Sequence, residues 1–433
     1  MISHDPLFTL IDKETRRQRE GVQLIPSENF ASENVRKAVG SPLMNKYSEG
    51  YPHRRYYEGN DIIDEIEDLA VKRACALFKV PHANVQPYSG SPANSAVLFG
   101  LLEAGDTIMG MKLASGGHLT HGHPGVTFSG KYFKTIQFGL NAHARIDLDE
   151  VRALAHHHKP KLMIIGTTAY PFILPFKEFA EIADEVGAFV LADISHIAGL
   201  IVAGVHPSPV PYADVVMTTT HKTLRGPRGA MLLVTERGLG KDPKLAEKID
   251  KAVFPGLQGG PHDNVTAGIA VALGEAATPE FKTYGQQVVK NAVALANALK
   301  KHGITLMGGG TENHLMIMDF SAFGGGTQVA YAMAIVGMYA NKNTIPNEPY
   351  SAFYPSGVRL GTPAVTTIGM KEKDMEKIAE WIAQVVEVVR PFVMPKEKEQ
   401  RGEFVKKFRV EMEKSATLRT IKSKVKAFLS KSF

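Results

Sequence analysis

Short apolar runs recur through the first two thirds of the chain, with helical stretches between them. A first strand is predicted over 84–87, and the apolar runs stand at residues 107–111, 133–138, 162–166 and 188–192. Because short apolar strands that alternate with helices are typical of a largely parallel sheet, this part is predicted to be an α/β domain. One helix is predicted over 61–79, before the first strand, and another from Pro6 to about Arg19.

The pattern becomes looser after about residue 280 and predicts a smaller α+β domain. Its predicted elements are a helix over about 279–302, strands near 314–320, a helix over 327–340 and a last helix near 371–390. We therefore divide the chain into an N-terminal helical arm (1–40), a large α/β domain (41–278), a small domain (279–395) and a basic helical tail (396–433). Residues 41–60 form a long, tyrosine-rich irregular segment, and loops of this kind are usually functional.

A polar turn between two predicted strands contains the residue on which the functional interpretation depends. A largely apolar stretch that ends in Ala213-Asp214-Val215-Val216-Met217 precedes the turn, and the apolar residues 230–234 follow it. Residues 218–229 between them read TTTHKTLRGPRG. Lys222 is surrounded there by hydroxyls, glycines and arginines. A lysine whose neighbours lower its pKa is a nucleophile that forms a Schiff base with a carbonyl compound. The alternative, a solvated surface lysine, describes most lysines of the chain, and we interpret Lys222 as the exception.

Composition places the chain among ordinary globular proteins. It has 433 residues, of which 44% are hydrophobic and 22% charged. No apolar run approaches the roughly 18–20 residues of a membrane span, and the first residues lack the basic and apolar regions of a signal peptide. The single cysteine, Cys75, excludes an internal disulfide and fits a reducing compartment. We therefore expect a cytoplasmic protein that makes no membrane contact.

The net charge of +6 is modest for this length, and much of it lies in the tail beyond Pro395. Such a tail can touch nucleic acid or acidic partners. The alternative is a solvated helical face whose other side carries Phe404, Phe408, Val410 and Leu418. We favour this second interpretation and expect no nucleic acid partner.

A candidate phosphate site stands between a predicted strand and a predicted helix, at Ser89, Gly90 and Ser91. Glycine lets the backbone approach an anion, the hydroxyls donate to it, and the helix N-terminus adds a partial positive charge. Such serine–glycine turns are common, so the signal alone is weak. The segment is not a P-loop, because no Gly-Lys-Ser/Thr follows it.

Asp193 lies at the carboxyl end of an apolar strand, where open α/β sheets bind ligands. An aspartate at this place can pair with a protonated pyridine nitrogen and make a pyridoxal ring an electron sink. The alternative is a helix N-cap. Lys222 follows on the next predicted strand, so an aspartate, an amine and the candidate phosphate site together meet the three demands of pyridoxal phosphate.

Two further residues suit the same chemistry. His118, in the motif GGHLTHG, follows another strand end and could lie flat on a cofactor ring. Closely spaced histidines also suggest metal ligands, but no cysteine or carboxylate cluster completes a site, so we expect no metal. Arg359 stands between glycines in SGVRLGTP, and its planar fork suits a substrate carboxylate, with a structural salt bridge as the alternative.

Taken together, these motifs resemble those of serine hydroxymethyltransferases over nearly the full length of the chain. The matching stretches are LIPSENF, NKYSEGYPHRRYYEGN, SGSPAN, GGHLTHG, ADISHIAGL, VVMTTTHKTLRGPRGA, FPGLQGGPH, NKNTIPNEP and SGVRLGTPA. Nine motifs in the order of the family make the resemblance specific.

The resemblance implies a pyridoxal-phosphate enzyme of fold-type I, like aspartate aminotransferase, with a mostly parallel seven-stranded central sheet and a smaller C-terminal domain. Such enzymes are homodimers or dimers of dimers in which two subunits share each active site. The implied reaction is the reversible conversion of L-serine and tetrahydrofolate to glycine and 5,10-methylenetetrahydrofolate. The alternative is a sister pyridoxal-phosphate enzyme, namely a threonine or allo-threonine aldolase, an α-methylserine hydroxymethyltransferase or a transaldolase.

The resemblance also implies residue roles. Lys222 would form the Schiff base with the cofactor, Asp193 would pair with the pyridine nitrogen, and His118 would stack on the ring. The implied catalytic residues are Lys222, Glu49, Tyr57, His118, Thr168 and His196. The implied cofactor-binding residues are Tyr47, Ser89, Gly90, Ser91, His118, Thr168, Asp193, His196, His221, Lys222, Gly259 and Gly260.

Several of these residues would come from the partner subunit. Tyr47, Gly259 and Gly260 would reach the phosphate from there, and Glu49, as acid/base, would stand at the reacting side chain with Tyr57. The implied substrate-binding residues are Ser27, Glu49, Tyr57 and Arg359. The implied folate-binding residues are Met109, Leu113 and Asn343.

Three residues depart from the usual pattern of the family and bear on substrate preference. Thr168 stands where serine is common, and it keeps the hydroxyl. Pro26 replaces a frequent alanine, and Glu58 stands where glycine is usual, which adds a carboxylate next to Tyr57.

Overall fold

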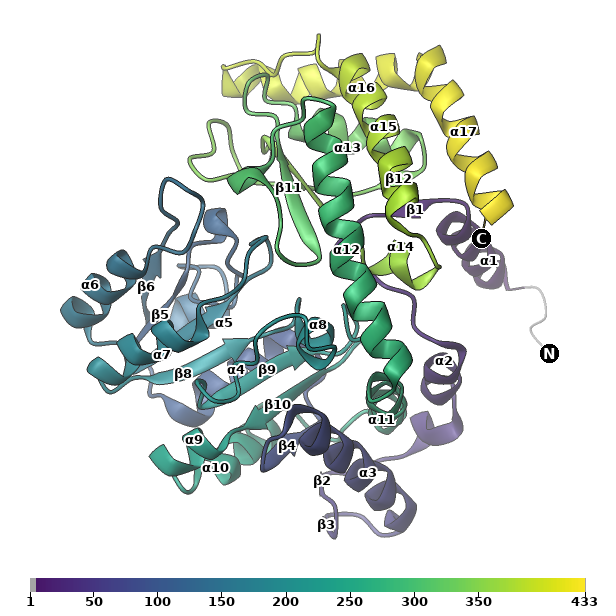
Figure 1. The fold of residues 1–433 in the computed structure, drawn as a ribbon. Helices are drawn as coiled ribbons and strands as arrows, with labels where there is room; N and C mark the ends of the chain where they lie inside the picture. The colour runs from purple at the N-terminus through teal and green to yellow at the C-terminus, as the bar shows by residue number, and fades with distance from the viewer. Residues whose placement is uncertain (1–4, 433) are drawn as a thin grey trace. The chain divides into compact units, whose positions relative to one another are not determined.

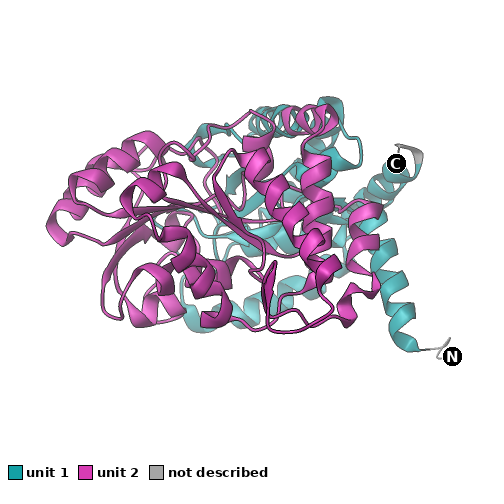
Figure 2. Ribbon diagram, turned by 90° about the horizontal axis from the view of Figure 1, so that it is seen from below, with its two compact units in different colours: residues 1–28, 287–433 teal, residues 29–286 magenta. Residues whose placement is uncertain are grey.

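The structure is a computed structural model that describes residues 5–432 (Figure 1). The chain forms two compact units, one made of residues 29–286 and the other of residues 1–28 with 287–433 (Figure 2). The beginning of the predicted N-terminal arm thus belongs to the same unit as the last third of the chain. The finer division into an arm, two domains and a tail stays a prediction.

The unit of residues 29–286 is built on a seven-stranded sheet, as predicted. Its strands are β4 (His82–Asn84), β5 (Thr107–Met111), β6 (Lys134–Phe138), β7 (Leu162–Gly166), β8 (Phe189–Asp193), β9 (Val215–Thr219) and β10 (Ala230–Val234), in the spatial order β4-β10-β9-β8-β7-β5-β6. The five neighbouring strands β6, β5, β7, β8 and β9 are parallel. Strand β10 runs antiparallel to both of its neighbours, β9 and β4. Strands β7, β9 and β10 are buried along their whole length, which explains why they are continuous apolar runs instead of alternating ones.

Helices cover this sheet and form its core with it. They are α2 (Glu33–Val39), α3 (Asp61–Phe78), α4 (Gly90–Leu101), α5 (Phe128–Tyr132), α6 (Leu148–His158), α7 (Phe176–Glu185), α8 (Ala198–Val202), α9 (Glu236–Lys241), α10 (Leu245–Lys251) and α11 (Asp263–Ala276). Helix α4 packs against β9 and β10, and α7 packs against β7 and β8 (Figure 1). Ser32 is the N-cap of α2, because its hydroxyl accepts a hydrogen bond from the backbone N–H of Val35 at 3.1 Å.

The other unit is an α+β structure. Its helices are α1 (Pro6–Arg19), α13 (Gly326–Ile335), α14 (Pro363–Thr367), α15 (Glu372–Val389), α16 (Arg401–Lys414) and α17 (Ala416–Ser432), and α12 (Pro279–Lys301) runs through both units. Strands β11 (Leu315–Asp319), β14 (Gly357–Gly361) and β13 (Asn341–Asn343) form an antiparallel sheet in that order. Strand β1 (Val22–Gln23) pairs in parallel with β12 (Met338–Tyr339) and thereby ties the N-terminal segment to this unit.

Two predicted elements differ from the observed ones. The helix predicted over 327–340 ends at Ile335, because Gly337 adopts a left-handed backbone (φ +81°) that turns the chain into β12. The strand predicted over 84–87 lies two to three residues earlier, at β4, because Pro87 lacks the N–H that a ladder needs. No helix within residues 5–432 is both long and apolar enough to span a membrane.

The basic tail is two helices with one buried face each. Phe408 and Met412 of α16, and Leu418, Ile421, Val425 and Leu429 of α17, belong to the core of this unit. The inward position predicted for Phe408 and Leu418 is confirmed, whereas Val410 is 53% exposed, so its predicted position is wrong. Val410 follows Phe408 by two residues, which places it on another side of the helix.

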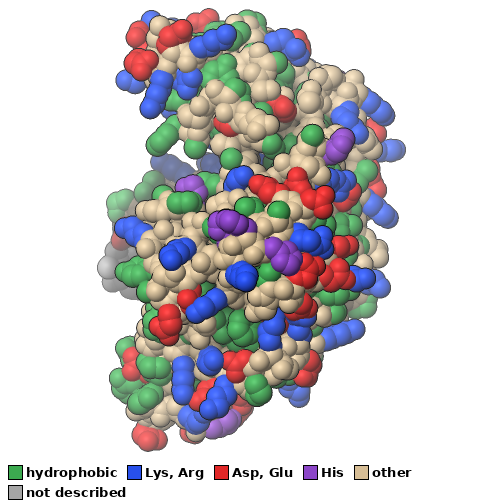
Figure 3. Space-filling view, turned by 90° about the vertical axis from the view of Figure 1, so that its left-hand side faces the viewer, with side chains coloured by type: hydrophobic (Ala, Val, Ile, Leu, Met, Phe, Trp, Pro, Cys, Tyr) green, Lys and Arg blue, Asp and Glu red, His purple; other side chains and the backbone are tan. Residues whose placement is uncertain are grey.

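Figure 3 shows one face of the molecule, on which charged side chains of both signs are interspersed.

Replacing Leu418 by alanine is expected to lower the free energy of unfolding by about 2–5 kcal/mol, since it removes a fully buried side chain and leaves a cavity. Denaturant unfolding of the purified protein measures this change. The matched control is Val410→Ala on the neighbouring helix, which is expected to change stability by less than about 0.5 kcal/mol. Equal losses in the two variants would contradict the packing described for the tail.

Candidate active site

Three strand ends bring polar residues to one edge of the central sheet. Asp193 is the last residue of β8, Thr168 follows the end of β7 by two residues, and Lys222 follows the end of β9 by three. Because β7, β8 and β9 are adjacent and parallel, their carboxyl ends meet at the same edge. This edge is where open α/β sheets bind ligands, as predicted for Asp193.

Asp193 is buried and fully engaged in hydrogen bonds. Its Oδ2 accepts hydrogen bonds from His121 Nε2 at 2.9 Å and from Asn94 Nδ2 at 3.0 Å, and its Oδ1 accepts one from the N–H of Ser195 at 3.0 Å. Burial alone would raise the pKa of Asp193, but the contact with His121, the N–H of Ser195 and the charge of Lys222 outweigh it and hold the pKa well below its usual range. Asp193 is therefore an anion inside the protein.

Residues from two other motifs orient this carboxylate, and sequence reasoning did not assign roles to them. His121 Nδ1 accepts a hydrogen bond from the backbone N–H of His118 at 3.3 Å, so Nε2 carries the proton that it donates to Asp193. Asn94 donates to the hydroxyl of Thr120 at 2.9 Å as well as to Asp193. These residues belong to SGSPAN and GGHLTHG, and their presence within those motifs was the only signal that could have found them.

His118 is held in a defined orientation. Its Nδ1 accepts a hydrogen bond from the N–H of Thr120 at 3.2 Å and lies 2.8 Å from the hydroxyl of the same residue, so the neutral ring carries its proton on Nε2. Burial, followed by the electrostatic interaction with the neighbouring His121 ring, lowers the pKa of His118 to about 4. The hydroxyl of Thr168 donates to the carbonyl of Gly117 at 3.0 Å and thus fixes the loop before His118.

Lys222 lies in the turn after β9 with its amine directed to a neighbouring hydroxyl. Its Nζ donates a hydrogen bond to Thr219 Oγ1 at 2.9 Å. The next residue, Thr223, donates from its hydroxyl to the carbonyl of His196 at 3.0 Å. The segment ADISHIAGL is thereby attached to the lysine turn through the backbone of His196, which is itself buried.

The candidate phosphate site combines a helix N-terminus with a glycine at which a side chain would clash. Helix α4 begins at Gly90, and a Cβ atom on Gly90 would lie 2.7 Å from Thr219 Cγ2, which is too close. Ser89 precedes the helix without capping it by its side chain, and Ser91 is exposed. The backbone N–H groups and hydroxyls of this segment are the donor set that binds an anion.

His221 carries a buried polar atom that fits the same interpretation. Its Nδ1 is buried and has no hydrogen-bond partner within residues 5–432. Burial, followed by the positive charges of Lys222 and Arg228, lowers the pKa of His221 to about 3, so the imidazole is neutral. Either nitrogen of a neutral imidazole can carry the proton, so Nδ1 can donate to an anionic ligand group beside the two cations.

The apoprotein is expected to lose stability in acid through His221. Its pKa is about 3 in the folded state and 6.5 as the ordinary value, so between these pH values the unfolded chain binds more protons. Stability is therefore fully present above about pH 6.5 and falls as the pH drops towards 3. Denaturant midpoints measured from pH 7 to pH 4 are expected to fall less steeply in His221→Gln than in the wild type. The exposed His157→Gln serves as a control and is expected to keep the wild-type slope.

A second cluster gathers the residues predicted to act in the partner's site. The hydroxyl of Tyr47 donates to Glu49 Oε1 at 3.1 Å, and the rings of Tyr47 and Tyr57 meet edge to face at 5.2 Å. A Cβ atom on Gly259 would lie 3.3 Å from Glu49 Oε1, and one on Gly260 would lie 3.6 Å from Glu49 Cγ. Tyr47 and both glycines also line a cavity of about 320 Å³. Tyr47 and Tyr57 are 57% and 47% exposed in the single chain.

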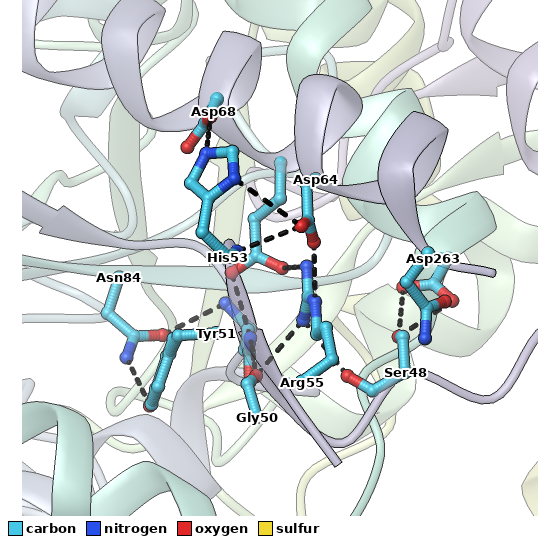
Figure 4. Close-up of polar contacts among 12 residues, drawn as sticks. Ser48, Gly50, Tyr51, His53, Arg55, Asp64, Asp68, Asn84 and Asp263 are labelled. Atoms are coloured by element: carbon cyan, nitrogen blue, oxygen red, sulfur yellow. Dashed lines mark hydrogen bonds and ion pairs between the residues drawn. The ribbon is translucent and has the colours of Figure 1, made fainter. Parts of the chain in front are cut away.

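Ion pairs and hydrogen bonds fix the loop that carries Glu49 (Figure 4). The hydroxyl of Ser48 donates to both carboxylate oxygens of Asp263 in α11, at 2.7 and 2.9 Å. Arg55 pairs with Asp64 at 2.8 Å and Glu67 at 2.7 Å, both in α3. Because all three side chains of this pairing are almost completely buried, the loop has a defined position next to the helices.

The remaining predicted residues are less informative. Met109 is fully buried in β5, and its place in the folate site stays a prediction. Leu113 is half-buried in a short 3-10 helix, Leu113–Ser115. Ser27, Arg359 and Asn343 belong to the other unit, where Arg359 Nε donates to Asn341 Oδ1 at 3.0 Å and burial lowers the pKa of Arg359 to about 10. Within residues 5–432, no group of three or more histidine, cysteine or acidic side chains is placed to share a metal ion.

Comparison with known proteins identifies the family. The family model described as serine hydroxymethyltransferase matches residues 2–382. The chain belongs to the serine hydroxymethyltransferase family. Serine hydroxymethyltransferases have the fold-type I architecture of pyridoxal-phosphate enzymes, so the predicted fold class is confirmed. They use pyridoxal phosphate and tetrahydrofolate.

Three bacterial serine hydroxymethyltransferases are similar to the chain over most of its length. The protein from Acidothermus cellulolyticus is 55% identical over 388 residues, which cover 89% of both chains. Those from Sorangium cellulosum and Desulfotalea psychrophila are 54% and 53% identical over 388 and 384 residues, with 89% and 88% of this chain covered, and 90% and 88% of theirs. The family model ends inside α15, so α16 and α17 lie beyond the part that it matches.

Proposed function

We propose that this serine hydroxymethyltransferase family member converts L-serine and tetrahydrofolate reversibly to glycine and 5,10-methylenetetrahydrofolate, with pyridoxal phosphate as its cofactor. The observation that carries the proposal is the meeting of Asp193, Lys222 and the Ser89–Ser91 segment at one edge of the sheet, in a chain of this family. The geometry alone would also serve a sister enzyme, and membership of this family is what favours one-carbon transfer over aldol cleavage.

The residues present fit pyridoxal phosphate. Asp193 offers a buried carboxylate to the pyridine nitrogen, and Lys222 offers an amine to the aldehyde. The Gly90 helix start and the unpartnered Nδ1 of His221 offer donors to the phosphate. When bound, pyridoxal phosphate supplies an electron sink for the electron pair left when the Cα–Cβ bond of serine breaks.

The polar network around Asp193 gives these residues their roles. Because Asp193 stays anionic, it keeps a proton on the pyridine nitrogen, while His121 and Asn94 hold the carboxylate in place. Lys222 would hold the cofactor through its amine, which is the nucleophile of the site. His118 is neutral and oriented by Thr120, so it can lie against the cofactor ring without adding a positive charge. Thr168 and His196 would lie near the cofactor's phenolic oxygen.

Substrate and folate residues complete the proposal. Arg359 and Ser27 would bind the carboxylate of serine, and Met109, Leu113 and Asn343 would line the folate site. Glu49 is the candidate acid/base, and it would act in the partner's site together with Tyr57. The enzyme would then be a homodimer or a dimer of dimers, with Tyr47, Gly259 and Gly260 reaching the partner's phosphate site.

A tetrahydrofolate-dependence assay tests the proposal. The purified protein is loaded with pyridoxal phosphate and given serine with and without tetrahydrofolate, and glycine is measured in both. Glycine formation that depends strongly on tetrahydrofolate is expected. Cleavage of threonine or allo-threonine, together with no tetrahydrofolate-dependent conversion of serine, would overturn the proposal in favour of an aldolase.

A further inference from the structure

Asn29 lies against the backbone of the proposed nucleophile Lys222, although the two residues are 193 positions apart in the sequence. We propose that Asn29, together with Tyr284, is a positioning residue that holds the Lys222–Arg225 turn and thereby places the Lys222 amine. The proposal rests on the function proposed above, because it assigns Asn29 a role through Lys222. All of these residues belong to the unit of residues 29–286.

The amide of Asn29 uses both of its hydrogens and its oxygen at once. Its Nδ2 donates one hydrogen bond to the carbonyl of Lys222 at 3.0 Å and another to the hydroxyl of Tyr284 at 2.8 Å. Its Oδ1 accepts from the backbone N–H of Phe30 at 2.9 Å. An amide with this donor and acceptor pattern can sit in only one orientation, since the flipped group would set oxygen against the carbonyl of Lys222.

The turn that Asn29 touches needs support. Arg225 donates its backbone N–H to the carbonyl of Lys222 at 3.1 Å, which closes the turn, and Arg225 adopts a left-handed backbone at φ +61°. Such a conformation is unfavourable for a residue other than glycine. Contacts outside the turn must therefore favour this conformation over the alternatives.

Tyr284 supplies such a contact to the same turn. The guanidinium of Arg225 lies over the ring of Tyr284, at 4.2 Å from its centroid, and over the ring of Phe281 at 5.2 Å. Cation–π contacts at these distances are attractive. Tyr284 thus contacts Arg225 through its ring and Asn29 through its hydroxyl, so the two residues brace both ends of the turn.

The brace acts on the backbone, whereas other residues hold the side chains of the same segment. Thr219 receives the amine of Lys222, and Thr223 is tied to the carbonyl of His196. With the backbone fixed as well, the Lys222 amine has few orientations to search before it attacks an aldehyde. Loss of the brace should therefore slow the reactions of this amine more than it weakens the binding of serine.

The test compares Asn29→Asp and Tyr284→Phe with the wild type. Aspartate has the shape of asparagine but cannot donate, so it faces the carbonyl of Lys222 with an anionic oxygen. Phenylalanine keeps the ring under Arg225 and removes only the hydroxyl. The control is Asn291→Asp in the other unit, because Asn291 Nδ2 likewise donates to a backbone carbonyl (Met370) and a hydroxyl (Thr366), both at 2.9 Å.

The main readout is the rate at which pyridoxal phosphate, added to the apoprotein, is fixed on Lys222. It is followed by visible absorbance and by mass spectrometry of Lys222 after borohydride reduction. In Asn29→Asp, this rate and kcat are expected to fall about tenfold, with KM for serine within about twofold of the wild type. Tyr284→Phe should show a smaller loss in the same direction. Asn291→Asp should lower the melting temperature and leave the rate of fixation unchanged.

Two results would overturn the proposal that Asn29 and Tyr284 hold the turn. One is a wild-type rate of fixation in Asn29→Asp, and the other is a loss of rate in Asn291→Asp as large as that in Asn29→Asp. The first would show that the turn needs no brace, and the second that general destabilisation explains the effect. A wild-type protein that fixes pyridoxal phosphate on Lys222 but does not convert serine would refute the proposed function alone, and the rates of fixation would still decide on the brace. A wild type that does not react at Lys222 would refute both.

Discussion

Replacing Lys222 by alanine is expected to abolish the conversion of serine, with a loss of about four orders of magnitude or more in kcat. The reason is that the variant removes the amine proposed to bind the cofactor aldehyde, which Thr219 Oγ1 holds by a hydrogen bond of 2.9 Å to Lys222 Nζ. The visible absorbance of lysine-bound pyridoxal phosphate is expected to disappear together with the activity. Absorbance spectra and tetrahydrofolate-dependent glycine formation measure both changes.

Two controls make this expectation specific. Lys222→Arg keeps a positive charge but removes the nucleophile, and it is expected to be as inactive as the alanine variant. Lys177→Ala removes a lysine that is 64% exposed in its side chain, and it should retain wild-type activity. Full activity in Lys222→Ala without an added amine would show that Lys222 is not the nucleophile.

The same variant tests whether active sites are shared between subunits. Lys222→Ala and Glu49→Gln are each expected to be nearly inactive as pure proteins. If Glu49 acts in the partner's site, a mixed dimer contains one site with both native residues. Statistical mixing of the two variants should then restore roughly a quarter of the wild-type activity. No recovery in dimers shown to be mixed would place Glu49 in the same subunit's site as Lys222.

The sheet and its ligand-binding edge could be predicted because their signals are local. Strands β7 to β10 consist mostly of buried apolar residues. Such runs are visible in the sequence without knowledge of the fold. The strand ends then locate Asp193 and Lys222. Helix α1 also begins and ends where it was predicted, because Pro6 marks its first turn and Arg19 its last.

The partners of those residues could not be predicted, because they are distant in the sequence. Asn94 and His121 reach Asp193 from positions 99 and 72 residues away, and no local pattern indicates that they do. For the same reason, the sequence does not show how deeply a particular side chain is buried. Met109, for example, is fully buried because β5 has neighbouring strands on both sides and lies inside the unit. Val410 was misplaced because a helix face cannot be assigned from composition alone.

The charge states around the candidate cofactor site follow from burial together with specific contacts. Burial keeps the imidazoles of His118 and His221 neutral, with pKa values of about 4 and about 3. It would also neutralise Asp193, but hydrogen-bond donors surround this carboxylate and keep it charged. The site therefore contains one buried anion beside the Lys222 amine, with neutral rings around it. This arrangement suits a cofactor that has a cationic ring nitrogen at one end and an anionic phosphate at the other.

Replacing Asp193 by asparagine is expected to lower kcat by about two to three orders of magnitude, because the charge that holds a proton on the pyridine nitrogen is lost. The variant keeps the size of the side chain, so the sheet should remain folded. Its amide cannot accept hydrogen bonds at both former oxygens, so it must lose either the pair of contacts with His121 and Asn94 or the one with the N–H of Ser195. Single-turnover rates with serine and the visible spectrum measure the effect.

A comparison of variants separates the charge of Asp193 from its hydrogen bonds. Asp193→Glu keeps the charge and displaces it, so a smaller loss than in Asp193→Asn is expected. His121→Gln keeps a donor to Asp193 while removing the imidazole, and it should retain most of the activity if the carboxylate charge is what matters. Equal losses in His121→Gln and Asp193→Asn would mean that orientation by His121 matters as much as the charge itself. A wild-type rate in Asp193→Asn would exclude Asp193 as the partner of the pyridine nitrogen.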